Sequence, residues 1–164
     1  MLKLKFIVPA LLIVLAGCSQ KIRTQAGVGT AKNQGDSLYV EMGIKAVIKA
    51  GEKVELKFTV HNDGAVAKSF CKWHTPFEPL MSRYLDVVDE QGNEAPYKGA
   101  MAKRIMPPPA DSYVMVKAQD KLTGEVDLVK AYELVAGKKY TVSYNSGGIS
   151  GLKTVGSVTF SYVH

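Results

Sequence analysis

The folded part of the chain is marked by an alternation of hydrophobic and polar positions. Every second residue from Leu38 to Ile48 is apolar, and the positions between them include Glu41 and Lys45. A second run, 54–60, repeats this period of two after a turn around Gly51. Because successive side chains of a strand point to opposite faces, each run predicts a strand with one face in a core.

Further strand-like segments occur at short intervals. They cover residues 69–74, 84–89, 113–117, 122–128, 140–144 and 156–163. A single helical turn is expected at 129–134, and no longer stretch has a strong helical period. Short strands between turn signals predict an all-β chain, specifically an immunoglobulin-like antiparallel β-sandwich of about seven to nine strands.

A local signature supports this fold class. Residues 134–142 resemble the corner before a late strand of immunoglobulin-like domains, where a tyrosine hydroxyl bonds back to upstream backbone. Tyr140 is the residue expected to do so. The alternative is that Tyr140 is simply a half-buried tyrosine of a strand.

The amino terminus has the pattern of an export signal. Lys3 and Lys5 precede an apolar stretch, 6–15, which is too short for a membrane-spanning helix, since such a helix needs about 20 apolar residues. The pattern is typical of a secretory signal. It ends in Leu-Ala-Gly-Cys at 15–18, which resembles the lipobox of bacterial lipoproteins.

The lipobox resemblance implies cleavage before Cys18 and attachment of several acyl chains there, which together anchor a protein stably. Ser19 implies the outer membrane by the sorting rule of that family. The expected organisation is a signal peptide at 1–17, a lipidated polar tether at 18–36 and a sandwich domain at 37–164. With Cys18 acylated, Cys71 has no cysteine partner and is expected to be a buried, inert thiol.

Charge excludes one class of partner. The formal charge of +6 falls by two when Lys3 and Lys5 leave with the signal peptide, and no dense basic cluster with interleaved aromatics remains. Nucleic acid is therefore not an expected partner.

Two irregular stretches interrupt the strands. Residues 73–80 contain Pro76 and Pro79, which exclude a central strand, and 97–109 end in three prolines that favour an extended, semi-rigid conformation. Long irregular segments of this kind are often functional.

The two stretches and their flanks carry a second resemblance. Its positions are Trp73, Thr75, Pro76, Phe77, Glu78, Leu80, Tyr97, Gly99, Met101, Lys103, Arg104, Asp111, Tyr113, Val126, Asp127, Leu128, Tyr132, Leu134, Gly137, Tyr140 and Val142. In order and spacing they resemble the β-rich propeptide domain of deuterolysin-type (aspzincin) zinc metalloendopeptidases, over roughly residues 52–145. Pro79 and Ala100 depart from the pattern. The peptidase itself is missing, because none of His61, His74 and His164 belongs to a His-Glu-x-x-His motif.

The resemblance implies a free-standing, membrane-anchored regulator or inhibitor of a secreted zinc metalloendopeptidase. Phe77 and Met101 are expected as apolar anchors, Lys103 and Arg104 as partners of acidic groups, and Glu78 as a group near the zinc or a cationic rim. Lys98 is expected as a further residue of the same protease-binding site. Solvated or core positions are the alternative for these residues. Trp73 is expected in the core.

Two other functions stay open. A periplasmic copper-binding lipoprotein would use soft ligands such as Cys71, His74, Met81, Met101, Met106 and Met115. A regular strand through both residues would place Cys71 and His74 on opposite faces, and no close Met pair supports a site. A structural or adhesion module would use a sheet edge.

No catalytic motif is found, so the chain is expected not to be an enzyme, and no metal or cofactor is expected.

Overall fold

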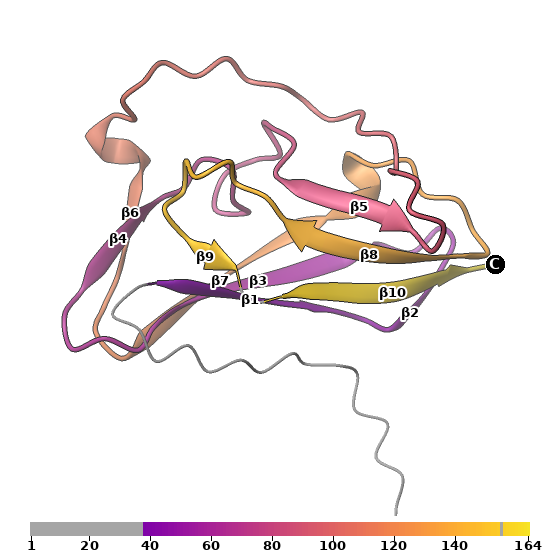
Figure 1. The fold of residues 1–164 in the computed structure, drawn as a ribbon, viewed down its shortest axis with the longest axis horizontal. Coiled ribbons are helices and arrows are strands. Elements are labelled where there is room, and N and C mark those ends of the chain that lie inside the picture. Colours follow the sequence, from indigo (N-terminus) through magenta and orange to yellow (C-terminus); the bar gives the residue numbers. More distant parts are fainter. Residues whose placement is uncertain (1–37, 155) are drawn as a thin grey trace, which may run out of the picture.

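Two four-stranded sheets and a two-stranded ribbon make up the domain (Figure 1). The computed structural model describes residues 38–154 and 156–164. The first sheet has the order β7 (Asp120–Asp127), β3 (Glu55–Asn62), β1 (Tyr39–Ile44), β9 (Lys153–Thr154). The second sheet has the order β2 (Val47–Lys49), β10 (Ser157–Val163), β8 (Lys138–Tyr144), β5 (Leu85–Asp89). The ribbon pairs β4 (Lys68–Cys71) with β6 (Tyr113–Val116), and the 3-10 helices η1 (Ala110–Ser112) and η2 (Leu128–Lys130) lie in connections.

This arrangement confirms the predicted all-β sandwich. In the first sheet β3 pairs antiparallel with both β1 and β7, and in the second β8 pairs antiparallel with both β5 and β10. That is the strand neighbourhood of immunoglobulin-like sandwiches. The described residues hold ten strands, one more than the upper end of the expected seven to nine, and the pairs β1–β9 and β2–β10 are parallel rather than antiparallel.

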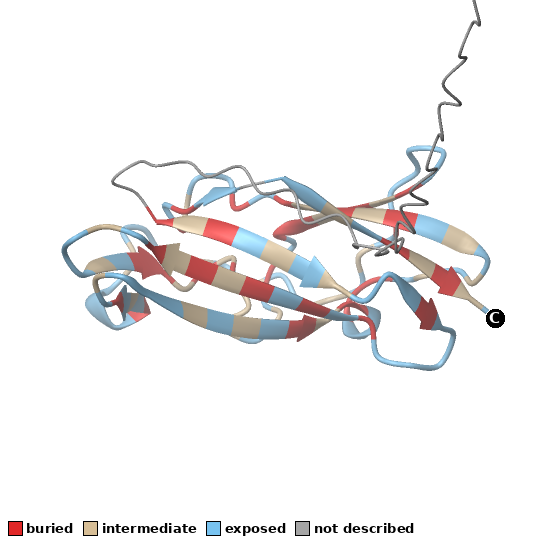
Figure 2. Ribbon diagram, turned by 90° about the horizontal axis from the view of Figure 1, so that it is seen from below, coloured by how far each residue is buried: buried red, intermediate tan, exposed pale blue. Residues whose placement is uncertain are grey.

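One hydrophobic core joins the two sheets. Val40 and Phe58 from the first sheet and Val142 and Phe160 from the second are all buried in it. Phe58 meets Tyr144 edge to face, with ring centroids 4.8 Å apart. Figure 2 shows buried and exposed positions alternating along the strands, as the period of two in the sequence predicts.

The first predicted strand is wrong in one respect. The run 38–48 is two strands rather than one: β1 ends at Ile44 and pairs with β3, whereas β2 begins at Val47 and pairs with β10 in the other sheet. The alternation continues in phase across the break, so the sequence pattern does not reveal it. The chain therefore changes sheets at Lys45 and Ala46.

Other boundaries also differ from the expectations. The segment predicted at 69–74 is a strand only to Cys71, and the helical turn expected at 129–134 is η2, which ends at Lys130. Asn62 lies beyond the predicted run 54–60, yet it is buried at the end of β3 and donates from its amide to the backbone oxygens of Val116 and Lys117. These hydrogen bonds satisfy the buried amide, which is how a polar side chain is accommodated at this end of the core.

Tyr140 forms the corner that the sequence predicts. Its hydroxyl oxygen accepts a hydrogen bond from the backbone N–H of Val135 at 2.8 Å, and its ring stacks on Phe160 at a centroid distance of 5.5 Å. The confirmed contact closes the connection that leads into β8.

Replacing Tyr140 by phenylalanine is expected to lower the free energy of unfolding by about 1 kcal/mol, because the Val135 N–H loses its partner while the ring packing stays. Tyr84→Phe is the matched control: Tyr84 is buried, and its hydroxyl has no hydrogen-bond partner in the described residues. Urea unfolding of both variants measures the difference. Equal losses would contradict a specific role for the corner.

An Asx-type turn comes directly after β5. The carboxylate of Asp89 accepts from the backbone N–H groups of Gln91 and Asn93, at 3.0 and 2.8 Å, and lies 2.6 Å from Nζ of Lys138 in β8. The hydrogen-bonded ammonium of Lys138 holds the pKa of Asp89 well below its usual range. This turn leads the chain into the long connection between β5 and η1.

Cys71 is a free, buried thiol, as expected. Cys18 and the predicted signal peptide and tether lie outside the described residues. Across 38–154 and 156–164, no helix has the length and apolar character needed to cross a bilayer.

Candidate functional site

Residues 97–109 (the 97–109 loop) form the later part of the long connection between β5 and η1. In Figure 1 it crosses the top of the view above β5 and β8. Its first residues are fixed on the segment 131–132, directly after η2: Tyr97 forms a β-bridge with Tyr132, and the N–H of Lys98 donates to the backbone oxygen of Ala131 at 2.7 Å. The N–H of Ala102 donates to the oxygen of Met81 at 2.6 Å.

Tyrosine rings hold the start of the loop. Tyr97 meets Tyr132 edge to face at a centroid distance of 5.2 Å, and the Tyr132 hydroxyl donates to the backbone oxygen of Leu85 at 2.6 Å. Burial raises the pKa of both tyrosines, so both stay neutral at physiological pH. The anchor therefore combines ring packing with one buried hydrogen bond.

A second segment, 72–78, forms a compact turn beneath the loop. The buried hydroxyl of Thr75 donates to the backbone oxygen of Lys72 at 2.5 Å and accepts from the N–H of Phe77 at 3.2 Å. His74 adopts a positive φ of 60°, and its N–H donates to the carboxylate of Glu78 at 3.1 Å. These contacts fix the position of the Glu78 carboxylate.

The two segments are joined by a largely buried ion pair. Nη2 of Arg104 lies 2.7 Å from each carboxylate oxygen of Glu78. The Glu78 side chain is 6% exposed and the Arg104 side chain 22% exposed. The Arg104 guanidinium also lies over the buried Trp73 ring, 4.8 Å from its centroid, which is a cation–π geometry. Glu78, Trp73 and Arg104 therefore pin the middle of the 97–109 loop to the turn below it.

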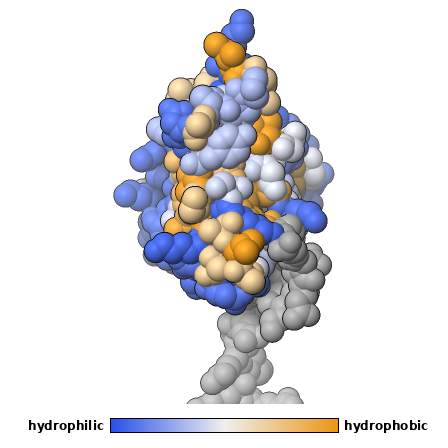
Figure 3. All heavy atoms as spheres, turned by 90° about the vertical axis from the view of Figure 1, so that its left-hand side faces the viewer, coloured by the Kyte–Doolittle hydropathy of each residue, from blue (hydrophilic) through white to orange (hydrophobic). Residues whose placement is uncertain are grey.

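Hydrophobic side chains on either side of this pin face the solvent. Met101 is 72%, Ile105 83% and Met106 61% exposed, and Lys103 between them is exposed as well. Figure 3 shows hydrophobic atoms next to hydrophilic ones on the part of the molecule that protrudes at the top. The loop thus presents apolar groups and a cation while its backbone is held in place.

The structure brings only two of the residues predicted for the site into contact, Glu78 and Arg104. Met101 and Lys103 lie near them in sequence but are exposed to solvent. Lys98 pairs instead with Glu133, at 2.5 Å. Phe77 packs against Phe70 of β4, at a centroid distance of 5.2 Å, and so lies partly buried against the core.

Sequence reasoning missed Ile105 and Met106, which are more prominent on the surface than Phe77. A signal for them was present: two large apolar residues stand directly before three prolines, where no core-facing alternation explains them. The role of Trp73 as a platform for Arg104 has no signal in the local sequence.

Metal-ligating groups do not assemble in the part of the chain that the structure describes. No cluster of three or more His, Cys, Asp or Glu side chains with the spacing of a metal site occurs there. Cys71 is buried in the ribbon, and His74 is half-buried in the turn below the loop.

Comparisons with known proteins place the chain only loosely. No model of a known protein family matches it. It is 32% identical over 115 residues to a protein of the fungus Arthroderma benhamiae described as an uncharacterized secreted protein, an alignment that covers 66% of this chain. The chain spans 59% of that relative's length.

A structural similarity is weaker still. It is to Pseudomonas fluorescens alkylpurine DNA glycosylase AlkC, bound to DNA containing an abasic site analogue, with a TM-score of 0.35 and 13% identity. The match covers 78% of this chain and 30% of that one. A similarity of this size carries no conclusion about fold or function.

Proposed function

We propose that this chain is an exported, lipid-anchored, non-enzymatic binding domain, and that its 97–109 loop contacts a partner protein. One observation carries the proposal: the loop exposes Met101, Ile105 and Met106 while the Glu78–Arg104 pair holds its middle in place. The proposed partner is a secreted zinc metalloendopeptidase, which the domain inhibits or regulates.

Pinning matters because ordering a loop during association costs free energy. A loop that is already ordered loses less conformational entropy, so more of its contact energy remains as affinity. Exposed apolar side chains grouped on one segment supply that contact energy, since burying them at an interface removes apolar surface from water.

The export half of the proposal rests on the amino terminus and on the relative. The apolar stretch 6–15 and the lipobox ending at Cys18 support delivery to the bacterial envelope and anchoring there, with Ser19 favouring the outer membrane. The fungal relative is described as secreted, which supports export in general. Acylation of Cys18 is tested by mass spectrometry of the protein extracted from membranes.

The choice of partner rests on the resemblance of residues 52–145 to an aspzincin propeptide. In this interpretation Met101, Ile105 and Met106 enter the substrate cleft, and Lys103 approaches acidic groups at its rim. Glu78 and Arg104 act as positioning residues beneath the loop rather than as contact residues, because each already pairs with the other.

The test is an inhibition titration. Residues 19–164, without lipid, are added to a purified aspzincin from the same organism while cleavage of a peptide is measured. We expect dose-dependent inhibition at micromolar or lower concentration. Absence of both inhibition and binding in that range would overturn the choice of partner.

A further inference from the structure

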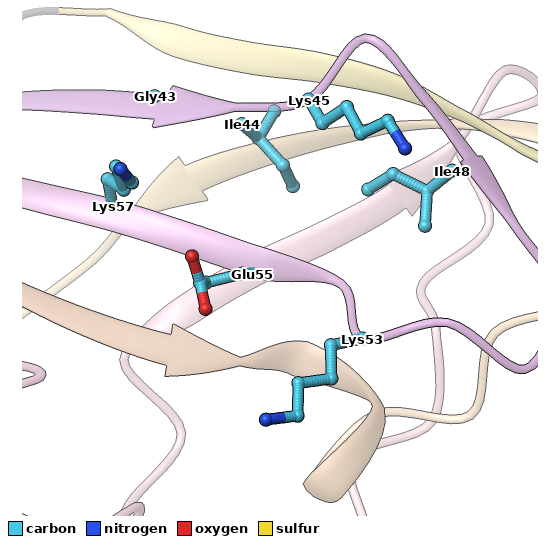
Figure 4. A pocket seen from close by; sticks show the side chains of 7 residues that line it. All are labelled: Gly43, Ile44, Lys45, Ile48, Lys53, Glu55 and Lys57. Carbon is cyan, nitrogen blue, oxygen red and sulfur yellow. The ribbon is translucent and has the colours of Figure 1, made fainter.

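A pocket opens where the chain changes sheets, at the opposite end of β1 from the predicted tether. It has a volume of about 220 Å³ and is lined by Gly43, Ile44, Lys45, Ile48, Lys53, Glu55 and Lys57 (Figure 4). β1 ends at Ile44 in the first sheet and β2 begins at Val47 in the second, so the pocket lies at the crossover between the two sheets.

Apolar side chains form the inner wall of the pocket. Figure 4 shows Ile44 and Ile48 directed into the space between the strands. Ile48 is buried, and Ile44 is half-buried against the core. Gly43, opposite Lys57 in the register of β1 and β3, contributes no side chain, and a Cβ placed there would meet nothing within 4 Å.

The rim of the pocket is cationic. Lys45, Lys53 and Lys57 line it together with one carboxylate, that of Glu55, so its lining has an excess of positive charge. Lys53 has no ion pair within the described residues. Lys45 and Lys57 make only long, exposed pairs, at 3.4 Å with Glu52 and 3.7 Å with Glu125.

Such exposed pairs contribute between zero and about 1 kcal/mol each to stability. Lys45 and Lys57 can therefore exchange these carboxylates for the anion of a ligand at little cost. A cationic rim above an apolar wall fits a ligand with two parts, an oxyanion and a short hydrocarbon segment. The volume is below the range typical of drug-sized ligands, which begins at about 300 Å³. The ligand or the bound part of it is therefore small.

We propose that this pocket binds the phosphate group and adjoining hydrocarbon of a phosphate-bearing amphiphile. The oxyanion lies among Lys45, Lys53 and Lys57, and the hydrocarbon covers the half-buried Ile44. The same chemistry occurs in a free alkyl phosphate and in the head-group region of an anionic phospholipid. The inference is independent of the 97–109 loop and of its proposed partner.

The test uses residues 19–164 with three probes: inorganic phosphate, octyl phosphate below its critical micelle concentration, and vesicles of phosphatidylcholine with and without phosphatidylglycerol. Calorimetry measures the soluble probes and co-sedimentation the vesicles. We expect octyl phosphate to bind at least about tenfold more tightly than inorganic phosphate, because only octyl phosphate covers the apolar wall. Pocket-dependent binding to phosphatidylglycerol vesicles alone would support the lipid source.

Two variants test the location. Gly43→Leu adds a side chain at a lining position where a Cβ meets nothing within 4 Å, and we expect it to obstruct the pocket and abolish binding with an unchanged melting temperature. The triple variant Lys45→Gln, Lys53→Gln, Lys57→Gln is expected to weaken binding about tenfold. Its control, Lys117→Gln, Lys121→Gln, Lys153→Gln, removes the same charge from exposed positions outside the pocket.

The outcomes are distinct. Loss of binding in the pocket variants with binding retained in the control supports the site, whichever probe binds. Equal losses in the two triple variants would show non-specific attraction to a basic surface and overturn it. Binding that is retained in Gly43→Leu would also overturn the site. The same holds if neither octyl phosphate nor phosphatidylglycerol vesicles bind.

Discussion

Replacing Glu78 by alanine is expected to lower the free energy of unfolding by about 2–3 kcal/mol. Removing one partner of a buried ion pair leaves the other charge without compensation, which costs about 3–5 kcal/mol when both are fully buried. Arg104 is 22% exposed and recovers some hydration, so the expected cost is lower. The N–H of His74 also loses its acceptor. Urea unfolding measures the change.

Glu94→Ala is the matched control for this variant. Glu94 pairs with Arg83 at 2.9 Å, but its side chain is 61% exposed and that of Arg83 37% exposed. Exposed pairs contribute at most about 1 kcal/mol, so the control is expected to change stability little. If both alanine variants lower the free energy of unfolding equally, the Glu78–Arg104 pair does not pin the loop.

Truncating the three exposed apolar residues of the loop is expected to separate binding from stability. Met101→Ala, Ile105→Ala, Met106→Ala removes side chains that are mostly solvated in the free protein, so the melting temperature is expected to stay nearly unchanged. Truncating a residue that dominates an interface typically weakens the free energy of binding by at least about 2 kcal/mol. Affinity for the peptidase is therefore expected to fall at least about thirtyfold.

The control for the loop variant removes the same kind of surface elsewhere. Val66, Val129 and Val135 are 60%, 40% and 53% exposed and lie outside the loop. Their joint replacement by alanine is expected to leave affinity within about twofold of the unmodified chain. If instead the valine variant loses affinity and the loop variant keeps it, the contact surface lies outside 97–109.

The fold was largely predictable because its strands have one buried and one exposed face. The alternation through Val54 and Val60 marks β3, and the corner at Tyr140 marks the entry to β8, so both the class and one specific contact are confirmed. The change of sheets after Ile44 was not predictable, because the apolar phase continues unbroken into β2. β9, at Lys153–Thr154, is too short to show any period.

The candidate site was predictable only in part. Two prolines in 73–80 and three in 97–109 indicate loops, and both stretches lie outside the strands, apart from the single bridge at Tyr97. The pairing of Glu78 with Arg104 joins residues 26 positions apart in different loops, and no local period encodes such a contact. Glu78 and Arg104, which sequence reasoning expected to face a partner, therefore face each other.

Hydrogen exchange of the amides in the 97–109 loop, read by mass spectrometry with and without the peptidase, tests most directly whether a pinned loop is the contact surface. Slow exchange is predicted in the free protein, including Ala102, whose N–H bonds to Met81, with faster exchange in Glu78→Ala. Adding the peptidase is predicted to increase protection within 97–109. A loop that exchanges at the rate of an unstructured peptide, or protection that appears only elsewhere, would contradict a pinned loop as the contact surface.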